Sequence, residues 1–130
     1  MVGQTRLVPR TLHDRVGGDE FFVTLVECFY ALVEHDPVLR PLYPEDLSEP
    51  KTWLTAFLVQ YWGGSTRYSE ERGHPRLRMR HAPFTIGQAE RDAWWRDMES
   101  AVRSSSAGPA EQAELLEYFD QAATFMINRP

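Results

Sequence analysis

The spacing of apolar residues along the chain predicts helices. After Asp19, apolar residues recur at steps of one, three and four, which is the period of a helix with one buried face that ends near His35. Asp36-Pro37 then stops this helix, because proline lacks the N–H that a continuing helix needs. The predicted buried face comprises Phe22, Leu25, Val26, Phe29, Tyr30 and Val33.

A second helix is predicted from Ser48 to the glycine pair Gly63-Gly64. Ser48 is a suitable N-cap, and Pro50 is tolerated in the first turn, where backbone N–H groups have no helical partner. Residues 38–50 contain three prolines and predict tight turns with one brief helix. The apolar positions of the second helix are Trp53, Leu54, Phe57, Leu58 and Tyr61.

Two more helices are predicted in the C-terminal half. Thr85 and Gln88 have the spacing of a capping box that opens the third helix. A loop at 104–109 leads to the last helix, which begins at about Ala110. The predicted inward positions are Ile86, Ala93 or Trp94, Met98, and Ala101 or Val102 in the third helix, and Leu115, Leu116, Phe119, Ala122, Ala123 and Met126 in the last.

The remaining segments are less regular. Residues 1–10 show no periodicity and are expected to form a flexible leader, while residues 11–16 predict one or two helical turns. Residues 65–84 are polar and rich in arginine, with a short helix predicted at 77–82, and such a long irregular stretch indicates a functional segment. With no period-2 pattern, the chain is predicted to be all-α, with one domain over 11–130.

Composition excludes several classes of protein. The 130 residues, 42% hydrophobic and 25% charged, are typical of one globular domain. A single cysteine, Cys28, excludes an internal disulfide framework and a zinc site built from cysteines. No apolar run approaches the ~20 residues of a membrane span, and no secretory signal follows Met1, so a cytoplasmic location is expected.

Charge is distributed unevenly along the chain. The net charge of −5 argues against nucleic-acid binding, yet four arginines gather within nine residues. Gly73 and Pro75 interrupt this cluster, so its arginines do not share one helix face as in a nucleic-acid patch. The cluster is therefore expected to bind an anion smaller than a nucleic acid. Its members are Arg72, Arg76, Arg78 and Arg80.

His81 carries the most specific chemical signal. The glycine pairs lack a phosphate-binding motif, and His81 lacks the neighbouring histidines or cysteines of a multidentate zinc site. Haem iron needs only one protein ligand, since the porphyrin supplies four nitrogens. A haem would also use aromatic walls and cations near its two carboxylates. The aromatic residues available are Tyr30, Tyr43, Trp53, Phe57, Tyr61 and Trp94, although ordinary core packing remains an alternative for them.

Three sequence runs resemble the group II truncated haemoglobins. They are LRPLYPED at 39–46, QYWGG at 60–64 and HPRLRMRHAPF at 74–84, and the resemblance extends from Leu12 to Ile127. It implies a truncated-globin fold, a two-over-two helical sandwich around one haem b. By position in these motifs, the resemblance implies His81 as the iron ligand.

The resemblance also implies the remaining site residues. Pro50 falls near the position of the distal histidine of other globins, so hydrogen bonds to a ligand are left to three aromatic side chains. The implied distal donors are Tyr30, Tyr43 and Trp94. Leu54 and Phe57 are implied at the apolar wall, and Tyr61, Arg72 and Arg80 near the haem carboxylates.

The expected function is the binding of O2 and other small ligands, namely NO, CO, peroxide or sulfide. Each hydrogen bond to bound ligand contributes ~1.5–3 kcal/mol, and ~1.4 kcal/mol is a tenfold change in rate, so O2 release should be slow. Slow release favours a redox or detoxification role, and an unidentified reductase is the expected electron donor. The resemblance implies NO dioxygenation or peroxide chemistry among the options, and a homodimer. The alternative is a haem-free helical interaction module whose aromatic stripe is only core.

Overall fold

This computed structural model describes residues 10–129. All of the regular secondary structure in this range is helical. No strand occurs in these residues, which confirms the all-α prediction. Within the same range, no helix combines the length and apolar character that a membrane crossing requires. The elements are α1 (Leu12–Val16), α2 (Asp19–Glu34), the 3-10 helix η1 (Arg40–Leu42), α3 (Ser48–Tyr61), α4 (Arg67–Arg72), α5 (Leu77–His81), α6 (Gln88–Arg103) and α7 (Pro109–Phe125).

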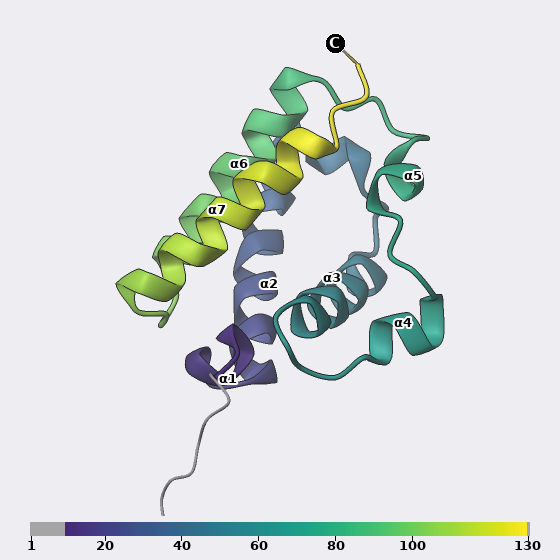
Figure 1. The fold of residues 1–130 in the computed structure, drawn as a ribbon. Helices are drawn as coiled ribbons and strands as arrows, with labels where there is room; N and C mark the ends of the chain where they lie inside the picture. The colour runs from purple at the N-terminus through teal and green to yellow at the C-terminus, as the bar shows by residue number, and fades with distance from the viewer. Residues whose placement is uncertain (1–9, 130) are drawn as a thin grey trace, which may run out of the picture.

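The long helices pack around a core that α2 dominates. Helix α2 contacts both α3 and α6, and α6 lies antiparallel beside α7 (Figure 1). Every position of the predicted α2 stripe is buried, as its helical period requires. The largest fully buried side chains are Phe22, Phe29, Phe119, Leu25, Leu39, Leu58, Met98 and Leu115.

Helix α1 docks against the end of α3 through a close backbone approach. The His13 N–H donates to the Trp62 carbonyl at 3.0 Å. A side chain at Gly63 would place its Cβ 2.6 Å from Thr11 Cγ2, and one at Gly64 would place its Cβ 2.8 Å from the His13 ring. Gly63 also has a φ of +106°, a conformation that favours glycine. The glycine pair therefore both ends α3 and makes room for α1.

Two predicted helix starts are wrong in detail. Ser48 is the first residue of α3, and its N–H donates to Asp46 Oδ1 at 2.9 Å, so the aspartate provides the capping group. Helix α6 begins at Gln88, where the Gly87 N–H donates to Glu90 Oε1 at 2.8 Å. Thr85 lies upstream of this start, outside the cap. In both cases a neighbouring carboxylate satisfies the free N–H group.

Helix α4 was not predicted from the sequence. Six residues are too few to show a helical period, so the helix depends on its tertiary contacts. Tyr68 is buried against the rings of Trp53 and Phe57, at centroid distances of 6.1 and 5.7 Å. Gln60 donates to Ser69 Oγ at 2.7 Å and accepts from the Ser69 N–H at 2.9 Å. Helix α3 thus holds α4 in place.

The predicted leader falls almost entirely outside the described residues, which begin at Arg10. The short helices α4 and α5 lie across from the α6 and α7 pair (Figure 1). They are linked by residues 73–76, which form no helix or strand. The arginine-rich segment therefore forms one side of the molecule, facing the long helices.

Candidate functional site

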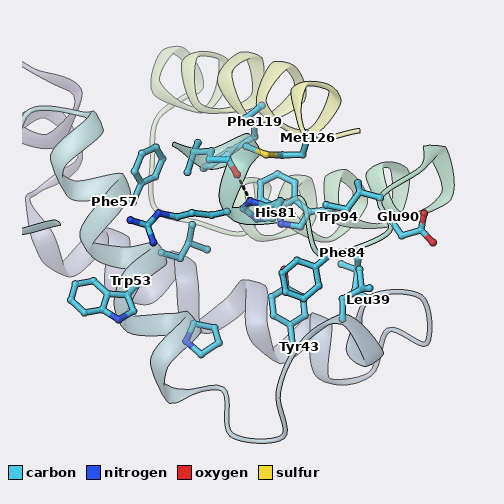
Figure 2. A pocket seen from close by; sticks show the side chains of 18 of the residues that line it. Leu39, Tyr43, Trp53, Phe57, His81, Phe84, Glu90, Trp94, Phe119 and Met126 are labelled. Carbon is cyan, nitrogen blue, oxygen red and sulfur yellow. Dashed lines mark hydrogen bonds between the residues drawn. The ribbon is translucent and has the colours of Figure 1, made fainter. Parts of the chain in front are cut away.

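A cavity of about 440 Å3 lies between the two sides of the molecule, with walls from α2 to α7. Its volume is in the range of small-molecule sites, ~300–1,000 Å3. Figure 2 shows aromatic and aliphatic side chains surrounding it. All predicted site residues except Tyr61 line this cavity, namely Tyr30, Tyr43, Leu54, Phe57, Arg72, Arg80, His81 and Trp94.

His81 ends α5 and lies at the cavity wall (Figure 2). Its Nδ1 lies 2.6 Å from the Leu77 carbonyl oxygen, the hydrogen bond drawn there as a dashed line. Because a carbonyl only accepts, Nδ1 must carry the hydrogen, which leaves the lone pair on Nε2. A histidine that ligates a metal is oriented in this way, by donating its other ring N–H. The cavity therefore contains one imidazole nitrogen free to bind.

Three polar aromatic side chains meet at another wall of the cavity. The rings of Tyr30 and Tyr43 pack edge to face, with centroids 5.5 Å apart. Trp94, from α6, lines the same cavity as the two tyrosines. Burial raises the pKa of Tyr43 to about 12 and also raises the pKa of Tyr30. Both hydroxyls are therefore protonated at neutral pH and can donate.

The core of the protein fixes the positions of these donors. Phe29 is fully buried, and its ring centroid lies 5.0 Å from that of Tyr30 and 5.4 Å from that of Trp94. Trp94 also packs against Phe119 of α7 at 5.8 Å. Aromatic contacts of this kind contribute beyond the burial of area alone. Tyr30 and Trp94 are thus held by core side chains of α2 and α7, and Tyr43 packs on Tyr30.

Two acidic residues that the sequence analysis did not identify lie behind Tyr43. Asp36 and Asp97 are both buried, and each carboxyl acts on the pKa of the other. Asp36 Oδ1 accepts the N–H groups of Val38 and Leu39 at 2.9 and 3.2 Å, whereas Asp97 Oδ2 accepts no hydrogen bond from the described residues. Burial raises the pKa of Asp97 to about 7, and the hydrogen bond from Asp97 lowers the pKa of Asp36. Asp97 therefore takes up a proton more readily than Asp36.

The two predicted cations serve different structural purposes. The Arg72 guanidinium stacks over the Trp53 ring, 4.8 Å from its centroid, at the edge of the cavity. Arg80 donates from Nε to the Pro75 carbonyl at 2.8 Å and from Nη2 to the Arg72 carbonyl at 2.9 Å. Arg80 therefore restrains the loop between α4 and α5, while the Arg72 guanidinium donates no hydrogen bond within residues 10–129.

Tyr61, predicted near the haem carboxylates, lies outside the cavity lining. Its side chain is 51% exposed, and its ring packs on that of Tyr118 at a centroid distance of 4.2 Å. Tyr118 occupies the wall instead, together with Phe119 and Met126. The apolar stripe of the last helix already placed Phe119 and Met126 inward but gave no sign that they face a cavity.

The other histidines do not line the cavity. His13 Nε2 lies 2.6 Å from Asp19 Oδ1, a contact that ties α1 to the start of α2. His74 Nδ1 accepts the Arg76 N–H at 3.1 Å, and His35 follows the last residue of α2. Among the histidines, His81 alone lines the cavity.

An all-helical chain that surrounds an apolar cavity with one free imidazole nitrogen has the architecture of a globin. The family model of the bacterial-like globins matches residues 11–128, and the chain belongs to this family. Family membership implies that it binds haem and small ligands, and the predicted resemblance to group II truncated haemoglobins is confirmed.

Several relatives agree with this assignment. The group 2 truncated hemoglobin YjbI of Bacillus subtilis is 45% identical over 85 residues, which is 65% of this chain and 64% of that protein. Two solved structures superpose over almost the whole chain. A thermostable hemoglobin from Thermobifida fusca is 48% identical, with 93% of this chain and 99% of that chain covered and a TM-score of 0.90. The group II truncated hemoglobin from Bacillus anthracis is 36% identical, with 95% of both chains covered and a TM-score of 0.91.

Proposed function

We propose that this protein binds haem b through His81 Nε2 and holds O2 or another small ligand against Tyr30, Tyr43 and Trp94. The observation that carries the proposal is the 2.6 Å contact between His81 Nδ1 and the Leu77 carbonyl oxygen, which leaves Nε2 to bind the iron. The same cavity presents hydrogen-bond donors at a second wall. When bound, the haem iron supplies an open coordination position for O2, NO, CO or sulfide.

The residues present fit such a cofactor. Leu54, Phe57 and Phe119 offer apolar surface to a flat macrocycle, and Figure 2 shows Phe57 and Phe119 at the cavity. Arg72, with its guanidinium on Trp53, is a cation for a haem carboxylate. Arg80 lines the cavity as well, with an Nη1 that its two backbone bonds leave unused. The apolar side chains would exclude water from the two faces of the macrocycle. The arginines would compensate the negative charge of the haem carboxylates at its edge.

The distal side chains favour a polar ligand over an apolar one. Tyr30 and Tyr43 are protonated at neutral pH, and the Trp94 indole can only donate. Three donors in a buried site lower the free energy of a ligand that accepts hydrogen bonds, which slows its release. Slow release supports a redox or detoxification role. A reductase partner, a cytoplasmic location and a homodimer belong to the proposal on the family resemblance alone.

An absorbance spectrum of the purified full-length protein tests the proposal. We expect a Soret band, either as purified or after reconstitution with haemin, and its loss or strong blue shift in His81→Ala while far-UV circular dichroism keeps its helical shape. His74→Ala is the matched control, because His74 lies in the same segment but outside the cavity lining. This control should keep the spectrum of the parent protein.

Two outcomes would overturn the proposal. A parent protein without a Soret band after haemin addition would favour the haem-free interaction module, with the aromatic residues serving only as core. A His81→Ala variant with an unchanged spectrum would assign the iron to another ligand. In that case the hydrogen bond between His81 and Leu77 would be purely structural.

A further inference from the structure

The chain after α7 folds back over the loop that follows His81. Residues 126–129, here called the C-terminal segment, run beside the connection between α5 and α6 (Figure 1). The Arg78 guanidinium donates to the Ile127 carbonyl at 2.9 Å, and the Arg129 N–H donates to the Ile86 carbonyl at 3.1 Å. The segment thus contacts both α5 and the approach to α6.

Asn128 makes the central contacts of this segment. Its side-chain oxygen accepts the Ile86 N–H at 2.9 Å. Its amide nitrogen donates to the carbonyls of Phe84 at 2.9 Å and His81 at 3.3 Å. The Asn128 backbone N–H donates to the Ile86 carbonyl at 2.8 Å. Both amide hydrogens and the amide oxygen are therefore used, a set that only an asparagine or a glutamine side chain can provide.

Besides the contacts of the C-terminal segment, the loop from His81 to Ile86 has, among the described residues, only short-range turn bonds, in which the Phe84 N–H donates to the His81 carbonyl at 3.0 Å and the Ala82 N–H donates to the Met79 carbonyl at 3.2 Å. Residues 82–85 are exposed, and the side chain of Phe84 is 42% exposed, so core packing does not fix the loop. Helix α5 has only five residues, too few to be stable in isolation. The carbonyl of His81 itself is one of the groups that Asn128 holds. Asn128 therefore supplies the long-range restraint on the His81 backbone, from 47 positions away.

We propose that Asn128 is a positioning residue for the axial imidazole. Asn128 fixes the backbone on the C-terminal side of His81, and the Leu77 carbonyl fixes the ring. Together they set where Nε2 lies relative to the cavity, and a ligand atom displaced by ~0.5 Å makes a weaker bond. This inference rests on the proposed function, in which His81 Nε2 binds the iron.

Three variants of the haem-loaded, full-length protein test the inference. Asn128→Ala removes all three side-chain hydrogen bonds, whereas Asn128→Asp keeps the acceptor for the Ile86 N–H and loses both donors. Gln112→Ala is the matched control, since Gln112 donates from its amide to the Ala107 carbonyl at 2.9 Å, in the loop between α6 and α7. The readouts are the iron–histidine stretching band of the ferrous protein by resonance Raman and the rate of haem transfer to apomyoglobin.

We expect the iron–histidine band to shift or broaden in both Asn128 variants. Haem transfer should become at least fivefold faster in Asn128→Ala and less accelerated in Asn128→Asp. Gln112→Ala should match the parent protein in both readouts. If Asn128→Ala fails to fold, Asn128→Asp decides, because it keeps the acceptor and with it the contact to Ile86.

The outcomes separate this inference from the proposed function. Asn128 variants with the parent band and the parent transfer rate overturn the positioning role and leave the haem site intact. A band shift of equal size in Gln112→Ala also overturns it, because any loosened loop would then have the same effect. A parent protein that binds no haem, or shows no iron–histidine band, overturns the proposed function and this inference together.

Discussion

The two walls of the cavity are built by different physical means. The distal wall, made by Tyr30, Tyr43 and Trp94, rests on Phe29 and Phe119, which lie in the core between long helices. The proximal wall, made by His81 and the loop to Ile86, rests on hydrogen bonds from Asn128 and on a five-residue helix. The distal wall is therefore held by packing of core side chains, and the proximal wall by hydrogen bonds to backbone groups.

The difference determines how each wall responds to change. The side chains that support the distal wall also belong to the hydrophobic core. A substitution that weakens their packing therefore lowers the stability of the whole protein. The proximal wall is held by a few hydrogen bonds at the surface. Its local opening therefore requires less free energy than global unfolding. Changes on the distal side should therefore appear first in stability, and changes on the proximal side first in the retention of haem.

The largest expected effect comes from Phe29→Ala on the distal side. Removing a fully buried ring costs ~3–5 kcal/mol through lost transfer energy and the cavity left behind. The loss also frees the rings of Tyr30 and Trp94. We expect a lower urea midpoint for the haem-loaded protein, followed by intrinsic fluorescence and circular dichroism.

Arg80→Met is the matching change on the proximal side. It removes the two bonds to the Pro75 and Arg72 carbonyls but keeps a long apolar side chain. We expect a smaller loss of global stability, ~1–2 kcal/mol, with a clear increase in haem loss. Equal losses of stability in Arg80→Met and Phe29→Ala would contradict the distinction between the two walls.

The same distinction explains how much the sequence could predict. The buried face of α2, including Phe29 and Tyr30, can be predicted from the helical spacing of its apolar residues alone, because a helix that packs on a core places apolar residues along one face. Helix α4 and the contacts of Asn128 leave no periodic signal, because hydrogen bonds to backbone carbonyls do not depend on the side chains of their partners. The sequence motif around His81 is enough to predict the iron ligand. Tyr61, in contrast, lies outside the cavity because its ring packs on Tyr118, a tertiary contact that no local sequence pattern shows.

A change of intermediate size is expected from Asp97→Asn, behind the distal wall. Burial raises the pKa of Asp97 to about 7, so between pH ~4 and ~7 the folded protein keeps a proton that the unfolded chain releases. The stability contributed by Asp97 therefore falls as pH rises through this window. Asparagine keeps a donor toward Asp36 at every pH. We expect the stability of the variant relative to the parent to rise by roughly 1–3 kcal/mol between pH 5 and pH 8.

Urea unfolding of the haem-loaded protein at pH 5 and pH 8 measures this difference. Asp36→Asn is the contrasting variant, because Asp36 Oδ1 accepts the N–H groups of Val38 and Leu39 and its carboxylate lies 3.5 Å from the Arg96 guanidinium. It should destabilise the protein at both pH values. Parallel pH profiles for Asp97→Asn and the parent would contradict the raised pKa of Asp97.

The smallest expected change in stability is that of Trp94→Phe, which tests hydrogen bonding within the distal wall. Phenylalanine keeps a ring between Phe29 and Phe119 but removes the indole N–H together with one ring of the indole, so the loss of stability should stay well below that of Phe29→Ala. The loss of one donor to the bound ligand is worth ~1.5–3 kcal/mol, which corresponds to an O2 off-rate at least about tenfold faster. Stopped-flow displacement of O2 by CO measures that rate. Trp95→Phe is the control, since Trp95 lies under the Arg91 guanidinium and outside the cavity lining. An off-rate unchanged in Trp94→Phe would mean that Trp94 only packs, and the two tyrosines would then account for ligand retention.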